Sequence, residues 1–123
     1  MTWIGMDLIK EGLSAFADQE FQDLAWTNSG GSLMSSPAED YEGLFTDSAL
    51  GHNLESGDIV FTEAIDEKLR LLRDSLRPIV SSHDPIEHVV AGEKMEAVRK
   101  MSAKILFELV RHEASSARAE TTE

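Results

Sequence analysis

A regular pattern of apolar residues runs through positions 62–78, TEAIDEKLRLLRDSLRP. Ile65, Leu69, Leu72 and Leu76 recur at spacings of four, three and four, which places them on one face of an α-helix. Thr62 stands where a helix N-cap is expected, because its hydroxyl can accept a hydrogen bond from the first turn. The residue before a proline disfavours helical backbone, so we expect Pro78 to end this helix near Leu76.

Two further stretches carry a stripe of the same helical period. Residues 6–16 repeat apolar side chains every three or four positions, and so do residues 93–113. Gly12 interrupts the first stripe at a cost of about 1 kcal/mol, unless it marks a close packing contact. The two stripes consist of Met6, Ile9, Leu13 and Phe16, and of Met95, Val98, Met101, Ile105 and Leu109.

Capping signals predict shorter helices between these stretches. Asp18 can cap a segment that ends near Trp26. The sequence Ser36-Pro37-Ala38-Glu39 has the order of a capping box with proline at the first helical position. Asp84-Pro85-Ile86-Glu87 repeats this order and predicts a short helix that stops at Gly92. Residues 46–60 contain Gly, Asn, Ser and Asp in turn-like combinations and are predicted to be irregular.

These elements predict an all-α fold. A chain of 123 residues suits one domain, and we expect a small helical bundle of about five helices, with a long irregular segment near residues 46–60. The helical domain is predicted to span residues 1–114, and residues 115–123, which lack bulky apolar side chains, to form a disordered tail. Leu69, Leu72, Met101 and Ile105 are expected in the core.

Negative charge is concentrated in the first half of the chain. Asp and Glu number 23 against 11 Lys and Arg, so the net charge is −12. Residues 1–60 hold eleven carboxylates and a single base, Lys10, and therefore carry −10 of that charge. Proteins that bind nucleic acid or anionic membranes usually present a basic surface, so neither is an expected partner. A basic protein is the expected partner, because clustered carboxylates attract it and repel acidic competitors.

The residues predicted to bind this partner are the carboxylates of three segments and two aromatic side chains beside them. A tight protein interface commonly combines an aromatic anchor with a charged rim. The alternative interpretation is that the carboxylates only solvate the surface and the aromatics fill the core. The candidates are Asp18, Glu20, Asp23, Trp26, Glu39, Asp40, Tyr41, Glu42, Asp47, Glu55 and Asp58.

Signs of catalysis or of a cofactor are weak in the sequence. There is no cysteine, and no phosphate-binding loop or zinc-protease pattern. His83 with Glu87, and Asp84 with His88, have a spacing of four but offer too few ligands for a metal site. We expect no enzymatic activity, no metal and no cofactor. The opening residues lack a basic and apolar leader, and a cytoplasmic protein is expected.

Several of these segments resemble small bacterial immunity proteins of contact-dependent growth inhibition systems. The resemblance runs through Phe16-Ala17-Asp18 with Phe21-Gln22 and Trp26, through Leu44-Phe45-Thr46-Asp47, and through the helices Leu69 to Leu76 and Val98 to Leu106. It implies a protein that binds the C-terminal toxin domain of a cognate adhesin-like effector and neutralises it in the cytoplasm. Such toxins are frequently nucleases, including tRNases. The resemblance carries no functional residue motif onto this chain.

Together, charge and resemblance predict an immunity protein that covers the active site or substrate-binding face of a basic nuclease. The alternative is a small acidic helical adaptor or regulatory protein with an unrelated protein partner. An enzyme of unrecognised type is the third possibility. A gene for a large secreted protein beside this one would favour the first.

Overall fold

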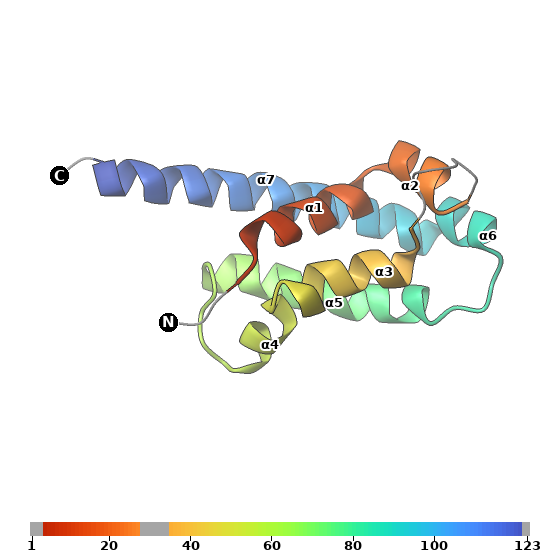
Figure 1. The fold of residues 1–123 in the computed structure, drawn as a ribbon, viewed down its shortest axis with the longest axis horizontal. Coiled ribbons are helices and arrows are strands. Elements are labelled where there is room, and N and C mark those ends of the chain that lie inside the picture. Colours follow the sequence, from red (N-terminus) through yellow and green to blue (C-terminus); the bar gives the residue numbers. More distant parts are fainter. Residues whose placement is uncertain (1–3, 28–34, 122–123) are drawn as a thin grey trace.

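The computed structural model describes residues 4–27 and 35–121, and these form helices and connecting turns without a strand (Figure 1). The all-α prediction is confirmed. Three long helices were expected and are present: α1 (Met6–Ala17), α5 (Glu63–Val80) and α7 (Glu93–Thr121). The shorter elements exceed those expected in a bundle of about five helices. They are α2 (Gln19–Ala25), α3 (Pro37–Tyr41), α4 (Leu50–Glu55), α6 (Ile86–Ala91) and a π-helix, η1 (Glu42–Asp47).

Helix α5 begins where its sequence predicts. The Thr62 hydroxyl accepts a hydrogen bond from the backbone N–H of Ile65 at 3.0 Å. The predicted stripe of Ile65, Leu69, Leu72 and Leu76 is buried along its whole length. The cap and the stripe therefore fix the start of α5 and the face that it turns to the core.

The predicted end of α5 at Leu76 is wrong, since the helix continues through Pro78 to Val80. Pro78 lies exposed in the last turn, where the missing N–H costs one hydrogen bond but no buried group is stranded. Ile79 is buried and holds this turn against the core. Ser81 closes it, because both its N–H and its hydroxyl donate to the Arg77 carbonyl.

Helices α1 and α7 run antiparallel along one side of the bundle (Figure 1). Lys10 of α1 pairs with Glu113 of α7 at 3.0 Å, and Gln22 of α2 bonds to Arg99 at the other end. Helix α7 passes the predicted end at Glu113 and continues to Thr121. Its last turns extend past the start of α1 (Figure 1). The domain boundary at residue 114 stays a prediction.

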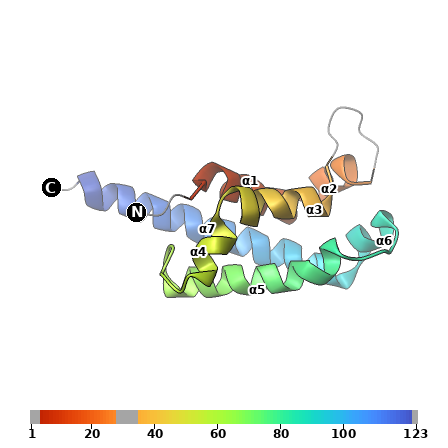
Figure 2. The same ribbon diagram turned by 60° about the horizontal axis from the view of Figure 1, so that its bottom comes forward.

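The core lies between α1, α5, α7 and the segment α3–η1. In Figure 2, α7 lies between α5 on one side and α1 with α3 on the other. Met101 is only partly buried, whereas the other three residues expected in the core are fully enclosed. The cluster of buried apolar side chains draws on every element except α3, whose Tyr41 packs against it partly buried: Ile9, Leu13, Phe16, Ala25, Trp26, Leu44, Phe45, Leu50, Leu54, Ile65, Leu69, Leu72, Leu76, Ile79, Val90, Met95, Val98, Ile105 and Leu109.

Two of the three predicted N-caps between the long helices are confirmed. Asp18 accepts a hydrogen bond from the Phe21 N–H at 3.1 Å, and its extended backbone separates α2 from α1. Ser36 accepts from the Glu39 N–H at 3.1 Å. The predicted cap at Asp84 is wrong, because α6 begins after Pro85 without a side-chain hydrogen bond. Gly92 follows the last residue of α6, as predicted.

The prediction of an irregular segment over residues 46–60 is wrong for most of that range. The π-helix η1 reaches Asp47, and α4 follows after Ala49, whose φ of 66° is left-handed. Leu50 and Leu54 of α4 are buried one turn apart, so the helix is held by the core rather than by a cap. Turn-forming residues therefore lie in a helix here because tertiary packing outweighs their local preference.

Residues 56–62 connect α4 to α5 without a helix. The buried carboxylate of Asp66, 1% exposed, accepts hydrogen bonds from the backbone N–H groups of Val60 and Phe61 at 2.7 and 3.0 Å. Gly57 has a φ of 88°, which suits glycine. Asp66 thus ties the chain entering α5 to the first turn of that helix.

Candidate protein-binding surface

An acidic groove lies between α1 and the segment α3–η1. Its volume is about 660 Å³, and four carboxylates line it, those of Glu11, Asp18, Glu39 and Asp40. Three of these residues were predicted to bind a partner, and the fold brings them together from two separate stretches of sequence. The fourth, Glu11, belongs to the same acidic half but was not predicted. Only the packing of α1 against α3 shows which face of α1 borders the groove.

Small residues on both walls give the groove its depth. Gly12 and Ala15 of α1 face Gly43 of η1, and none of them carries a side chain that could fill the space. A Cβ atom on Gly12 would lie 2.7 Å from Cβ of Leu44, so glycine is required for the close approach of α1 and η1. The sequence had allowed a packing role for Gly12, and the structure confirms it.

Among the described residues, Lys10 is the only base that lines the groove. Its ammonium group is engaged by Glu113 at 3.0 Å, with a second contact at 3.4 Å. This pair directs the lysine toward α7 and partly cancels its charge. The four carboxylates therefore leave the groove with a net negative charge.

Trp26 lies in the core rather than on the surface where the anchor was expected. Its side chain is 7% exposed and meets the Phe16 ring edge to face at a centroid distance of 5.8 Å. The indole N–H donates to Oδ2 of Asp40 at 2.7 Å, and the Ser35 hydroxyl donates to the same oxygen. Asp40 is thus partly committed to holding α3 against Trp26, which corrects the sequence-based role of Trp26.

Tyr41 is half-buried and packs against Phe45 at a centroid distance of 5.0 Å. Of the two predicted anchors it is the one that keeps part of its ring accessible. Glu42 and Asp47 lie exposed on η1, and Glu20 and Asp23 lie exposed on α2. None of these four carboxylates lines the groove, but all add negative charge to the elements around it.

The last two candidates lie apart from the groove. Glu55 ends α4 and Asp58 follows in the turn, at the opposite end of the bundle from α2 (Figure 1). Glu55 pairs with Arg73 of α5 at 3.7 Å, so its charge is partly compensated. The structure does not bring Glu55 and Asp58 to the surface shared by Asp18, Glu39 and Asp40.

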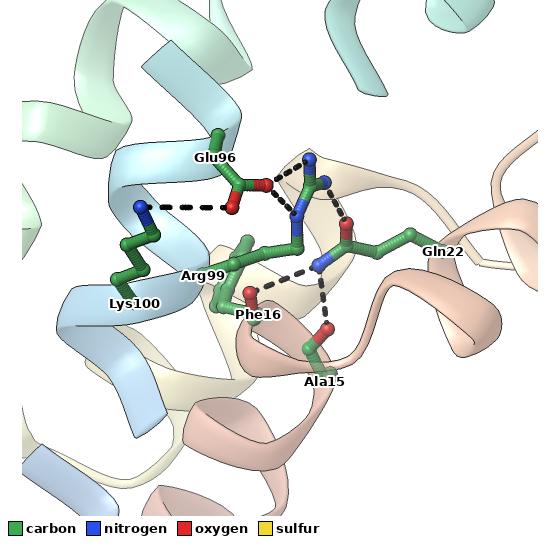
Figure 3. A network of polar contacts seen from close by, with 6 residues as sticks. All are labelled: Ala15, Phe16, Gln22, Glu96, Arg99 and Lys100. Carbon is green, nitrogen blue, oxygen red and sulfur yellow. Dashed lines mark hydrogen bonds and ion pairs between the residues drawn. The ribbon is translucent and has the colours of Figure 1, made fainter. Parts of the chain in front are cut away.

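A buried polar network fixes the end of α1 and the start of α2 against α7 (Figure 3). The Gln22 amide donates to the carbonyls of Ala15 and Phe16, each at 2.9 Å, and so satisfies the end of α1. Its oxygen accepts from Nη1 of Arg99 at 2.8 Å, while Glu96 binds the other side of the guanidinium. Because Asp18 lies between these two helices, the network also holds its position in the groove wall.

The bases of the second half of the chain pair mainly with acids of the same half. Lys68 pairs with Glu108, Arg77 with Asp74, and Arg99 with Glu96. Among the described residues, Glu55 is the only predicted binding carboxylate with an ion pair. The folded chain therefore does not neutralise the acidic half by packing it against basic helices.

Residues 4–27 and 35–121 also bear on metal binding and on membrane insertion. No group of three or more His, Asp or Glu side chains is arranged to hold a metal ion in these ranges. Among their helices, none has the length and apolar composition needed to cross a membrane.

Comparison of the chain with protein-family models, with curated proteins and with solved structures finds no match. The partner of the acidic surface is therefore inferred from charge and shape.

Proposed function

We propose that the protein is an immunity protein that binds a basic nuclease toxin domain through the acidic groove and neutralises it. The observation that carries this proposal is the set of carboxylates, Glu11, Asp18, Glu39 and Asp40, gathered around one hollow from α1 and α3. A nuclease binds phosphates with Lys and Arg side chains, and the same side chains are attracted by carboxylates.

The shape of the groove suits side chains that project from a partner. The small residues Gly12, Ala15 and Gly43 on its walls leave room for the long stems of lysine or arginine. Charged hydrogen bonds from a guanidinium to a carboxylate are about twice as strong as neutral ones. A toxin whose phosphate-binding side chains are held in this way is blocked from its nucleic acid.

The exposed acids around the groove serve a second purpose in this proposal. Glu20 and Asp23 on α2, with Glu42 and Asp47 on η1, extend the negative potential beyond the contact itself. Such a field raises the rate at which a basic partner meets the surface. It also disfavours binding of the many acidic proteins in a cell.

The test uses the protein encoded immediately upstream of this chain. Its C-terminal domain is purified, assayed for cleavage of RNA and DNA, and titrated with this chain. The informative variant reverses three exposed carboxylates, as Glu11→Lys and Glu39→Lys in the groove and Glu42→Lys on η1. Side chains of these residues make no hydrogen bond or ion pair within the described chain, so the fold is expected to persist.

A matched control reverses Glu63, Glu87 and Glu93, which are exposed, lie in helix first turns and belong to the second half. The control changes net charge by the same amount as the test variant. We expect the groove variant to lose several kcal/mol of binding and most of its inhibition, and the control to lose far less. Equal losses in the two variants, or inhibition that survives both, would contradict the proposal. Binding to a protein without nuclease activity would favour the adaptor alternative.

A further inference from the structure

A row of exposed apolar side chains lies on α7, beside the acidic groove, and the hollow that it borders shares Ser14, Asp18 and Leu106 with that groove. Phe107 is 62% exposed and Val110 is 46% exposed, although both are large apolar residues. With Ala103 and Leu106 they form one wall of a shallow hollow of about 540 Å³, and Ser14 and Ala17 of α1 form the other wall. Residues 103, 106, 107 and 110 follow helical spacing, so they form a continuous stripe.

The edge of this stripe that faces away from α1 is basic. Lys100, Lys104 and Arg111 are exposed and follow the same helical spacing, displaced around α7 toward α5. The Arg111 guanidinium lies 5.7 Å from the centre of the Phe107 ring, so the charge borders the apolar stripe directly.

The opposite edge, on α1, is acidic. Asp18 lines the hollow, and Glu11 is exposed one turn before Ser14. The contacts Lys10–Glu113 and Gln22–Arg99 fix the antiparallel register of the two edges. Because α1 and α7 each rise about 1.5 Å per residue along their axes, Asp18 at the end of α1 lies level with Lys104 of α7. In the same register, Glu11 lies level with Arg111.

We propose that the protein self-associates through this stripe as a parallel two-fold dimer. When the two-fold axis runs parallel to α7, Phe107 and Val110 of one copy pack on the same residues of the other copy. The acidic edge of each copy then lies opposite the basic edge of the other, at the same level along the axis. Lys104 of each copy then faces Asp18 of the other. Arg111 likewise faces Glu11. A two-fold axis perpendicular to α7 would instead place acid on acid and base on base.

Charge complementarity favours a second copy over other occupants of the stripe. A partner of one sign would meet like charge along one of the two edges, whereas a second copy offers both signs at matching heights. The net charge of −12 on each copy opposes association. We therefore expect a reversible dimer that forms at high concentration rather than an obligate one.

Sedimentation equilibrium of the full chain, at concentrations up to about 1 mM, tests the proposal. We expect a monomer–dimer equilibrium that Phe107→Glu weakens at least about tenfold. Because Phe107 is exposed, this variant is expected to keep its fold, which circular dichroism and thermal melting verify. Leu24→Glu, at another exposed apolar position on α2, is the matched control and should leave the equilibrium unchanged.

Charge exchange at the second pair tests the arrangement. Glu11→Arg and Arg111→Glu should each weaken the dimer about threefold or more, and the double variant should restore it. Glu11→Arg makes the chain less negative, so an effect of net charge alone would strengthen association instead.

A chain that stays monomeric throughout overturns the proposal, as does a dimer that survives Phe107→Glu. Failure of the double variant to restore the dimer overturns the parallel arrangement. These measurements contain no toxin, so their outcome is independent of the proposed function.

Discussion

Arg99 on α7 donates a hydrogen bond to Gln22 on α2 over 2.8 Å, across 77 residues of sequence. Both side chains are buried, and the same Gln22 side chain satisfies two carbonyls at the end of α1. One amide therefore joins the end of α1, helix α2 and the N-terminal part of α7. A charged group is retained in the interior here because each of its polar neighbours is satisfied.

We expect Gln22→Ala to lower the free energy of unfolding by about 3 kcal/mol. The substitution leaves the Arg99 guanidinium with an unpaired buried edge and removes the donor for two carbonyls. Urea denaturation measures the change. Lys100→Ala is the control, since its contact with Glu96 is exposed and 3.9 Å long, and it should cost less than about 1 kcal/mol. A loss no larger than that of the control would show that the network does not stabilise the fold.

Gly12→Ala is expected to destabilise the protein by about 1–3 kcal/mol, although alanine favours helices. The new Cβ would lie 2.7 Å from Cβ of Leu44 and would push α1 away from η1. Gly43→Ala, on the facing element, meets nothing within 4 Å and should be neutral or slightly stabilising. Gly12→Ala should lower the melting temperature, whereas Gly43→Ala should leave it unchanged or raise it, and a rise in both would refute the close contact.

Leu72→Ala should cost about 2–5 kcal/mol, because it opens a cavity at a fully buried position of α5. The neighbouring Leu71 is 52% exposed, and its replacement by alanine should change stability by no more than about 0.5 kcal/mol. Chemical denaturation of both variants compares the two faces of one helix. Similar losses would contradict the orientation of α5.

Association with the proposed basic partner should depend on salt. If the carboxylates of α1, α2 and α3–η1 attract it, raising salt from low to physiological concentration should slow association and change dissociation less. Stopped-flow mixing at several salt concentrations separates the two rates. An association rate that does not respond to salt would mean that the acidic half serves solubility alone.

Local signals were sufficient for the long helices and for some of their ends. In the stripe from Ile65 to Leu76, neighbouring members are at most four positions apart. The caps at Thr62 and Ser36 likewise bond to residues three positions away, so the sequence alone reveals both features. Helix α4 was not predicted, because its formation depends on contacts with residues distant in the sequence. Leu50 and Leu54 form only one apolar pair, and its burial depends on the distant core.

Part of the candidate surface could likewise be predicted from the sequence, and part depended on the fold. Charge is additive along a chain, so its concentration in residues 1–60 could be counted before any fold was known. Whether an aromatic residue packs inside or anchors a partner depends on its neighbours in space. The prediction that Trp26 anchors a partner was wrong, because Phe16 and Asp40 contact its side chain in the folded structure.

The sequence by itself thus determined an all-α fold and an acidic half, since helical period and charge are properties of neighbouring residues and of composition. Only the tertiary structure decided which carboxylates share a groove. Asp18 and Glu39 meet there because Gly12 lets α1 approach η1 closely, and Glu55 does not because α4 turns to the other end of the bundle. Such contacts join residues far apart in the chain, and their geometry is fixed when the core packs.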